Sequence, residues 1–207
     1  MIEPSDITKE KSLGAIWWAY RKNTPERRAN RLLYGVPAIL GILHSFLGSQ
    51  SVGQLLSEIR SLADLSVSFA ASILGFLLAG FTIFAVMTKP DLFARMATTK
   101  YETGQLSFLK QNFFAFIDAF IVYLSFVTFC FAIHILGAPN GVASTALGQL
   151  GGDAMAVKRT VARVVLSVEI ASLSYTLVKL KSFIFNVFHI VMTGIRWEVE
   201  AKKPSGE

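Results

Sequence analysis

Four ionisable side chains fall within or beside long apolar stretches of the sequence: Asp118, Glu169, Lys179 and Lys181. A charged group inside a bilayer is unfavourable unless it is paired or lines water, so such residues are functional candidates. A carboxylate in this setting can bind a proton or a cation, and a lysine can neutralise it or extend to the headgroups. These residues are the first candidates for a membrane-embedded polar site.

Helix register predicts which of these groups meet. If the apolar stretches 113–136 and 161–183 are antiparallel helices, Asp118 lies about 8 Å inside one end at 1.5 Å per residue. Lys179 lies at a similar depth on the other helix. We therefore predict an ion pair between Asp118 and Lys179.

The same register places His134 and Arg163 at a common level near the opposite end of the two helices. Glu169 falls opposite Thr128 and has no evident partner in the sequence. Glu169 therefore has two interpretations: a hydrogen-bonded structural glutamate, or a pore-lining or proton-linked carboxylate.

Small residues recur every fourth position at Ala71, Gly75 and Ala79. Such a stripe allows two helix backbones to approach closely in a membrane. The partner helix could belong to the same chain or to a second copy, and the sequence leaves both alternatives open.

Known catalytic signatures are missing from the sequence. It has no nucleophile elbow, phosphate-binding loop or metalloprotease helix. The three histidines, His44, His134 and His189, lie in different segments, and the single cysteine, Cys130, has no second thiol for a disulfide or a metal pair. We expect no catalytic residue, no metal site and no cofactor, and we do not expect an enzyme.

The amino-acid composition predicts the kind of fold that positions these residues. The chain has 207 residues, of which 53% are hydrophobic and 16% charged, whereas soluble domains carry about 25% charged residues. Its mean hydropathy is +0.51. This composition indicates an all-α, polytopic integral membrane protein, because one compact core of this length could not hide so much apolar surface from water.

About 20 apolar residues are needed for a helix to cross a bilayer. Four stretches approach this length, and we predict transmembrane helices at about 32–47, 65–87, 113–136 and 161–183. The last helix is expected to continue to about residue 195. A competing register for it, 171–193, would bury two lysines near the bilayer centre at about 2.5–3.5 kcal/mol each.

The distribution of basic residues predicts the orientation. With four spans and both termini cytoplasmic, all but four of the 20 Lys and Arg lie on the cytoplasmic side, as the positive-inside rule requires. Residues 1–24 are expected to form an amphipathic interfacial helix, with Leu13, Ile16, Trp17 and Tyr20 on one face. Residues 25–194 form the predicted transmembrane domain and 195–207 a cytoplasmic tail.

Function is predicted only in outline. We expect a non-enzymatic inner-membrane protein of a bacterium that self-associates and forms a pore or channel-like assembly. The alternatives are an anchor or sensor subunit that docks a cytoplasmic protein, for example in envelope stress or phage defence, and a small cation or proton-coupled transporter. Anionic lipid headgroups are the expected partners of the basic cytoplasmic face. Nucleic acid is not expected, because membrane topology already accounts for the positive charges.

Overall fold

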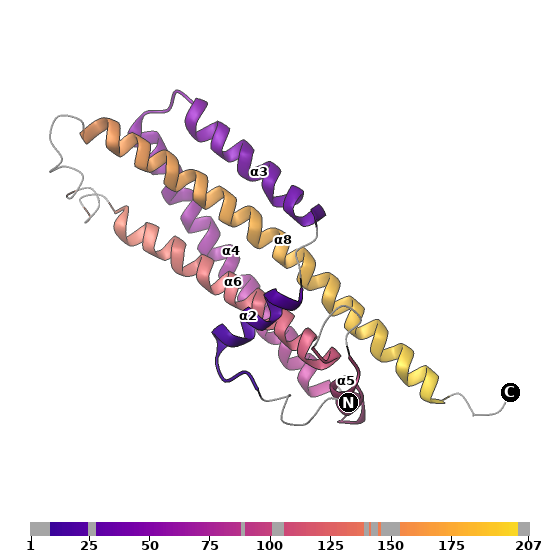
Figure 1. The fold of residues 1–207 in the computed structure, drawn as a ribbon. Helices are drawn as coiled ribbons and strands as arrows, with labels where there is room; N and C mark the ends of the chain where they lie inside the picture. The colour runs from indigo at the N-terminus through magenta and orange to yellow at the C-terminus, as the bar shows by residue number, and fades with distance from the viewer. Residues whose placement is uncertain are drawn as a thin grey trace. The chain divides into compact units, whose positions relative to one another are not determined.

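The computed structural model describes residues 9–24, 28–87, 90–100, 106–138, 141, 145 and 154–202. Within these ranges the chain is helical, apart from short connections and one isolated bridge between Lys100 and Ser107. The all-α prediction is therefore confirmed for this part of the chain. The helices, shown in Figure 1, are α2 (Leu13–Asn23), α3 (Arg28–Leu47), α4 (Val52–Met87), α5 (Pro90–Thr98), α6 (Phe108–Leu136) and α8 (Ala154–Lys202).

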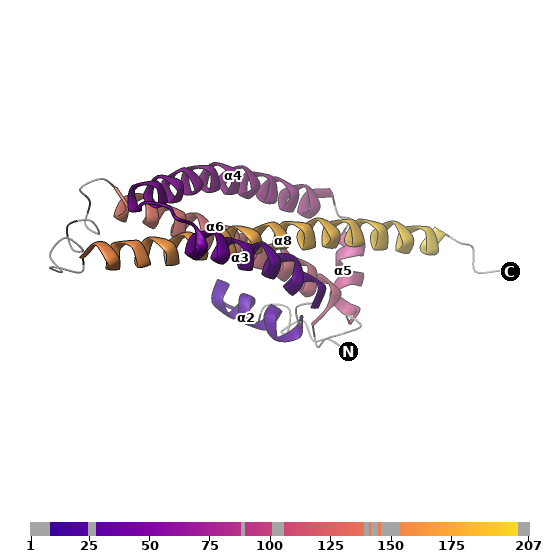
Figure 2. The ribbon, with the colours of Figure 1, turned by 90° about the horizontal axis from the view of Figure 1, so that it is seen from above.

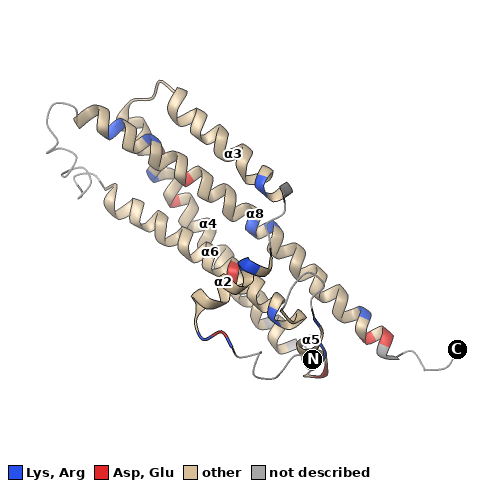
Figure 3. Cartoon of the chain, in the orientation of Figure 1, with Lys and Arg blue, Asp and Glu red and all other residues tan. Residues whose placement is uncertain are grey.

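Among the described residues, three helices are long and apolar enough to cross a membrane. They are Val52–Val86, Phe108–Leu136 and Ala154–Glu200, and Figure 3 shows long parts of α4 and α6 without charged side chains. The predicted first span, 32–47, lies within α3, which is not among the three. Its first turns carry Asn30 and Arg31, and Pro37 and His44 interrupt the apolar sequence.

All four helices that contain predicted spans are longer than those spans, and α4 and α8 extend furthest beyond them. α4 begins at Val52, whereas the predicted span begins at residue 65. α8 continues to Lys202, so the predicted end near residue 195 is wrong. The reason is local: residues 195–202 contain no helix breaker, and the next proline in the sequence is Pro204.

The chain forms two compact units. Unit 1 comprises Met1–Pro25, Leu77–Ile121 and Lys179–Glu207, and unit 2 comprises Glu26–Phe76 and Val122–Val178. Each of the long helices α4, α6 and α8 contributes a segment to both units. Each unit also has buried apolar side chains of its own.

In unit 2, α3 and segments of α4, α6 and α8 lie alongside one another (Figures 1 and 2). Buried apolar side chains from α4, α6 and α8 form the core, including Leu55, Ile59, Phe126 and Leu166. The buried Tyr123 hydroxyl donates a hydrogen bond to the Thr176 carbonyl, 2.9 Å away. This contact joins α6 to α8 in an apolar setting where an unpaired hydroxyl would be costly.

The close approach of α3 to α8 occurs at Gly41. A Cβ added to Gly41 would lie 2.6 Å from Cγ2 of Ile170, so only glycine fits without movement. Ser45, one turn later, is also buried and donates to the Gly41 carbonyl. The Gly41 and Ser45 pair is a small-residue contact of the kind that allows helix backbones to approach in membranes. This contact was not predicted from the sequence, although the four-residue spacing was its signal.

Replacing Gly41 with alanine is expected to lower the free energy of unfolding in detergent by about 1–3 kcal/mol, because the new methyl group overpacks against Ile170. Gly35→Ala on the same helix is the matched control, since a Cβ there meets nothing within 4 Å. That control should be neutral or slightly stabilising. Equal effects of the two substitutions would show that α3 does not pack on α8 through Gly41.

In unit 1, α2 packs on α6. Tyr20 is buried with Leu106, Phe114 and Ala115, and Ile16 packs against this cluster. Part of the face predicted for the membrane surface is therefore covered by protein, while Leu13 and Trp18 stay exposed. α2 begins at an N-cap, where the Ser12 hydroxyl accepts from the Ala15 amide.

Aromatic rings fill much of the remaining core of unit 1. Phe81 and Phe84 of α4 contact Phe113 and Phe116 of α6, and Phe116 packs edge-on against Phe183 of α8. Ring pairs at these separations add stabilisation beyond the area that they bury. They hold together the three long helices around the polar groups of this unit.

Candidate functional site

Asp118 of α6 is the centre of a polar cluster in unit 1. Its carboxylate is 3% exposed. The Lys179 ammonium donates to its Oδ2 atom at 3.0 Å, which confirms the ion pair predicted from helix register. Arg21 Nε lies 3.6 Å from the other oxygen, Oδ1. One buried carboxylate therefore connects α2, α6 and α8, and the participation of Arg21 was not predicted.

Two further contacts attach the N-terminal segment to α6. Lys110 forms an ion pair with Glu10, and both side chains are largely buried. The Gln111 side-chain amide donates to the Thr24 hydroxyl. Lys181, another predicted site residue, is exposed. The polar groups of unit 1 thus serve mainly to hold its helices together.

Glu169 of α8 lies in unit 2 in a different environment. Its side chain is 0% exposed, and neither carboxylate oxygen has a hydrogen-bond partner among the described residues. Hydroxyl groups nearby on α8 are satisfied by their own helix: Ser167 and Ser172 each donate to the carbonyl four residues earlier. Unlike these hydroxyl groups, the Glu169 carboxyl group makes no hydrogen bond to the described residues. It therefore lacks the hydrogen bonds expected of a structural glutamate in that part of the chain.

Cys130 of α6 lies near this carboxyl group and near the Ser66 side chain of α4. Cys130 and Ser66 are both buried. The Ser66 hydroxyl also lacks a geometrically good hydrogen bond in the described residues. Cys130 lies two residues beyond Thr128, the residue of α6 that helix register places opposite Glu169.

Of the buried polar residues Glu169, Cys130 and Ser66, only Glu169 could be identified from the sequence. Glu169 was identified because its charge interrupts an apolar stretch. Cys130, a single thiol with no second cysteine, indicates no site by itself, and Ser66 gives no signal, since serine is common in membrane helices. Their meeting at one point required the three-dimensional structure.

His134 and Arg163 do not form a pair with one another. His134 Nδ1 lies 3.1 Å from Asp64 Oδ1, and Arg163 donates to the Gly48 carbonyl at 3.3 Å. Arg60 similarly donates to the Gly137 carbonyl at 2.9 Å. These polar contacts tie the helix ends of unit 2 together, and they satisfy backbone carbonyls that the helices leave open.

The small-residue stripe of α4 has no partner in the described part of either unit. Ala71 and Gly75 are exposed in unit 2, and Ala79 is exposed in unit 1. A Cβ added to Gly75 would meet nothing within 4 Å. In the described residues the stripe therefore makes no close helix contact within either unit.

A buried carboxyl group in a membrane helix can bind a proton or a cation. No three His, Cys, Asp or Glu side chains among the described residues are grouped so that they could hold a metal ion. Asp118 is neutralised by cations, whereas no cation or donor from the described residues pairs with Glu169. Glu169, with Ser66 and Cys130 around it, is the best candidate for a functional site. Compared with known protein families, curated proteins and solved structures, the chain gives no match.

Proposed function

We propose that this chain is a non-enzymatic protein of a bacterial inner membrane that binds and releases a proton or a small cation at Glu169. The single observation that carries the proposal is the complete burial of a carboxyl group with no hydrogen-bond partner among the described residues, on a helix long and apolar enough to span a membrane. Transport or coupling across the bilayer is the activity that such a site serves best.

Burial of the Glu169 carboxyl group lowers the stability of the folded protein unless a ligand satisfies it. Burial of a polar group that stays unsatisfied costs about 1–3 kcal/mol, and more if the group is charged. Glu169 gains no hydrogen bond or ion pair from the described residues in return. A bound proton removes the charge, and a bound cation supplies the missing partner, so either ligand would stabilise the site.

The proposal includes four spans with both termini cytoplasmic. Three spans are α4, α6 and α8, and the fourth is α3, whose exposed surface is largely apolar. The arginines that precede residue 32 in the sequence can extend to the headgroups and lengthen the effective span. The positive-inside distribution of the basic residues supports this topology.

Flux measurements in proteoliposomes test the proposal. Under an imposed ion or pH gradient, the wild-type protein should carry a flux that Glu169→Gln reduces by about tenfold or more, as expected when a carboxylate ligand is lost. Asp64→Asn on α4 is the control, because Asp64 is an exposed carboxylate outside the buried site. Equal flux in wild type and Glu169→Gln, or sealed liposomes with every ion tried, would contradict the proposal.

Self-association is a second candidate function, and the uncovered stripe on α4 favours it. The exposed Ala71 and Gly75 offer a surface on which the same helix of a second copy could approach closely. A pore formed between copies would not be lined by Glu169, which is buried inside unit 2. Native mass spectrometry in nanodiscs should give a discrete homo-oligomer, whereas a monomeric mass would contradict this candidate.

A further inference from the structure

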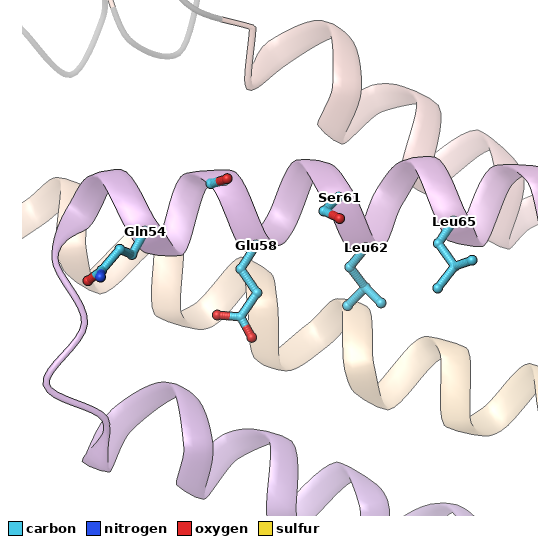
Figure 4. A pocket seen from close by; sticks show the side chains of 6 residues that line it. Gln54, Glu58, Ser61, Leu62 and Leu65 are labelled. Atoms are coloured by element: carbon cyan, nitrogen blue, oxygen red, sulfur yellow. The ribbon is translucent and has the colours of Figure 1, made fainter.

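A groove of about 650 Å³ follows one face of α4 in unit 2. It is lined by Gln54, Ser57, Glu58, Ser61, Leu62 and Leu65. Figure 4 shows Gln54, Glu58, Leu62 and Leu65 projecting from the same side of α4. The groove is separate from the buried Glu169 site, so a ligand bound in it is independent of the function proposed for Glu169.

The polar end of the groove carries one carboxylate among neutral polar side chains. Glu58 carries the one formal charge among the six lining residues, and the Ser57 and Ser61 hydroxyls lie on the same face. The Glu58 carboxylate already accepts from Gln50 at 2.9 Å and contacts His44 at 2.9 Å. A carboxylate offers about four acceptor positions, so it retains capacity for a further donor.

His44 contacts Glu58 itself, whereas the arginine that reaches this end is engaged elsewhere. Arg163, which reaches the turn between α3 and α4, donates to the Gly48 carbonyl and lies over the Phe46 ring. The groove itself has no lysine or arginine in its lining. Its charge therefore disfavours an anionic headgroup and favours a cationic one.

Polarity along the groove changes in the direction of the helix. Gln54, Ser57 and Glu58 lie toward the start of α4, whereas Leu62 and Leu65 lie further along the helix. With a rise of 1.5 Å per residue, Leu65 lies about 10 Å beyond Glu58 along the helix axis. Leu65 is 64% exposed. A polar end followed by apolar surface matches a lipid headgroup followed by its acyl chain, and α4 is one of the helices able to span a bilayer.

We propose that this groove binds a phospholipid whose headgroup carries a primary ammonium group, with the ammonium at Glu58 and an acyl chain along Leu62 and Leu65. A primary ammonium has three N–H donors, which suit a carboxylate flanked by two serine hydroxyls. A quaternary ammonium of the same charge has no N–H to donate, and a phosphatidylglycerol headgroup has no positive charge.

The test is lipid retention measured by native mass spectrometry of the full chain in detergent. Phosphatidylethanolamine, phosphatidylcholine and phosphatidylglycerol with identical acyl chains are added in equal amounts. The wild type should retain phosphatidylethanolamine about tenfold better than the other two, since charge-assisted hydrogen bonds provide the difference. Glu58→Gln should remove this preference, and the matched control Asp64→Asn, a carboxylate outside the groove lining on the same helix, should keep it.

Two results would overturn the proposal. One is equal retention of the three lipids by the wild type, because the groove would then not recognise the ammonium. The other is an unchanged preference in Glu58→Gln, because the lipid would then bind elsewhere. Since Glu58 is partly exposed, the substitution should leave the melting temperature close to that of the wild type. Leu65→Asn provides a second variant, which should weaken retention of all three lipids together.

Discussion

Replacing Asp118 with alanine is expected to lower the free energy of unfolding in detergent by about 3 kcal/mol, because removing one partner of a buried ion pair leaves the other charge uncompensated. Lys179, whose side chain is only 17% exposed, loses its 3.0 Å contact, and Arg21 loses its carboxylate partner as well. Reversible unfolding with a denaturing detergent, followed by circular dichroism, measures the change. Glu200→Ala is the control, because an exposed carboxylate in surface ion pairs should contribute less than about 1 kcal/mol.

A double substitution separates the ion pair from simple packing. If the loss in Asp118→Ala comes from the broken ion pair with Lys179, then Asp118→Leu combined with Lys179→Leu should recover most of the stability, since apolar pairs often replace buried ion pairs without cost. Arg21 is partly exposed and can turn to water. No loss in the single variant, or no recovery in the double variant, would show that the pair does not carry this part of the fold.

Replacing Glu169 with leucine is expected to have the opposite sign. Removal of a fully buried carboxyl group that makes no hydrogen bond to the described residues should raise the free energy of unfolding by about 1–3 kcal/mol. The same variant should lose the flux proposed for the wild type. Gain of stability together with loss of activity is the usual signature of a residue kept for function at a cost to folding.

The outcome for Glu169→Leu also decides between the two interpretations of this residue. A structural glutamate would be hydrogen-bonded, and its replacement would lower stability as at Asp118. Glu169→Gln, which preserves shape, is the companion variant and should leave stability near the wild type. Lower stability in both variants would contradict the functional assignment, whatever the flux measurements give.

The contrast between these two carboxylates shows where tertiary structure was needed. Both interrupt apolar stretches, and the sequence alone marks both as costly in a bilayer. The partner of Asp118 could be predicted because Lys179 lies at the matching depth on the neighbouring helix, and helix rise is constant. The environment of Glu169 could not, because it depends on buried side chains of other helices that are distant in sequence, such as Ser66 and Cys130.

Close helix packing was likewise decided by the fold. The sequence contains small residues at four-residue spacing on both α3 and α4, and spacing alone does not say which set meets another helix. In the structure Gly41 contacts Ile170, whereas Gly75 has open space around it. The difference depends on how each helix is rotated about its own axis, which is set by the whole packed unit.

Composition and hydropathy by themselves determined that the chain is helical and that it carries segments able to cross a membrane, because the length and apolar content of a stretch suffice for that conclusion. Local sequence also determined that α5 begins at Pro90, because proline is favoured in the first turn of a helix. Only the tertiary structure decided which buried polar groups are paired, that α2 packs on α6, and that Glu58 lies in a groove. Those features depend on side chains distant in sequence, so no local pattern could specify them.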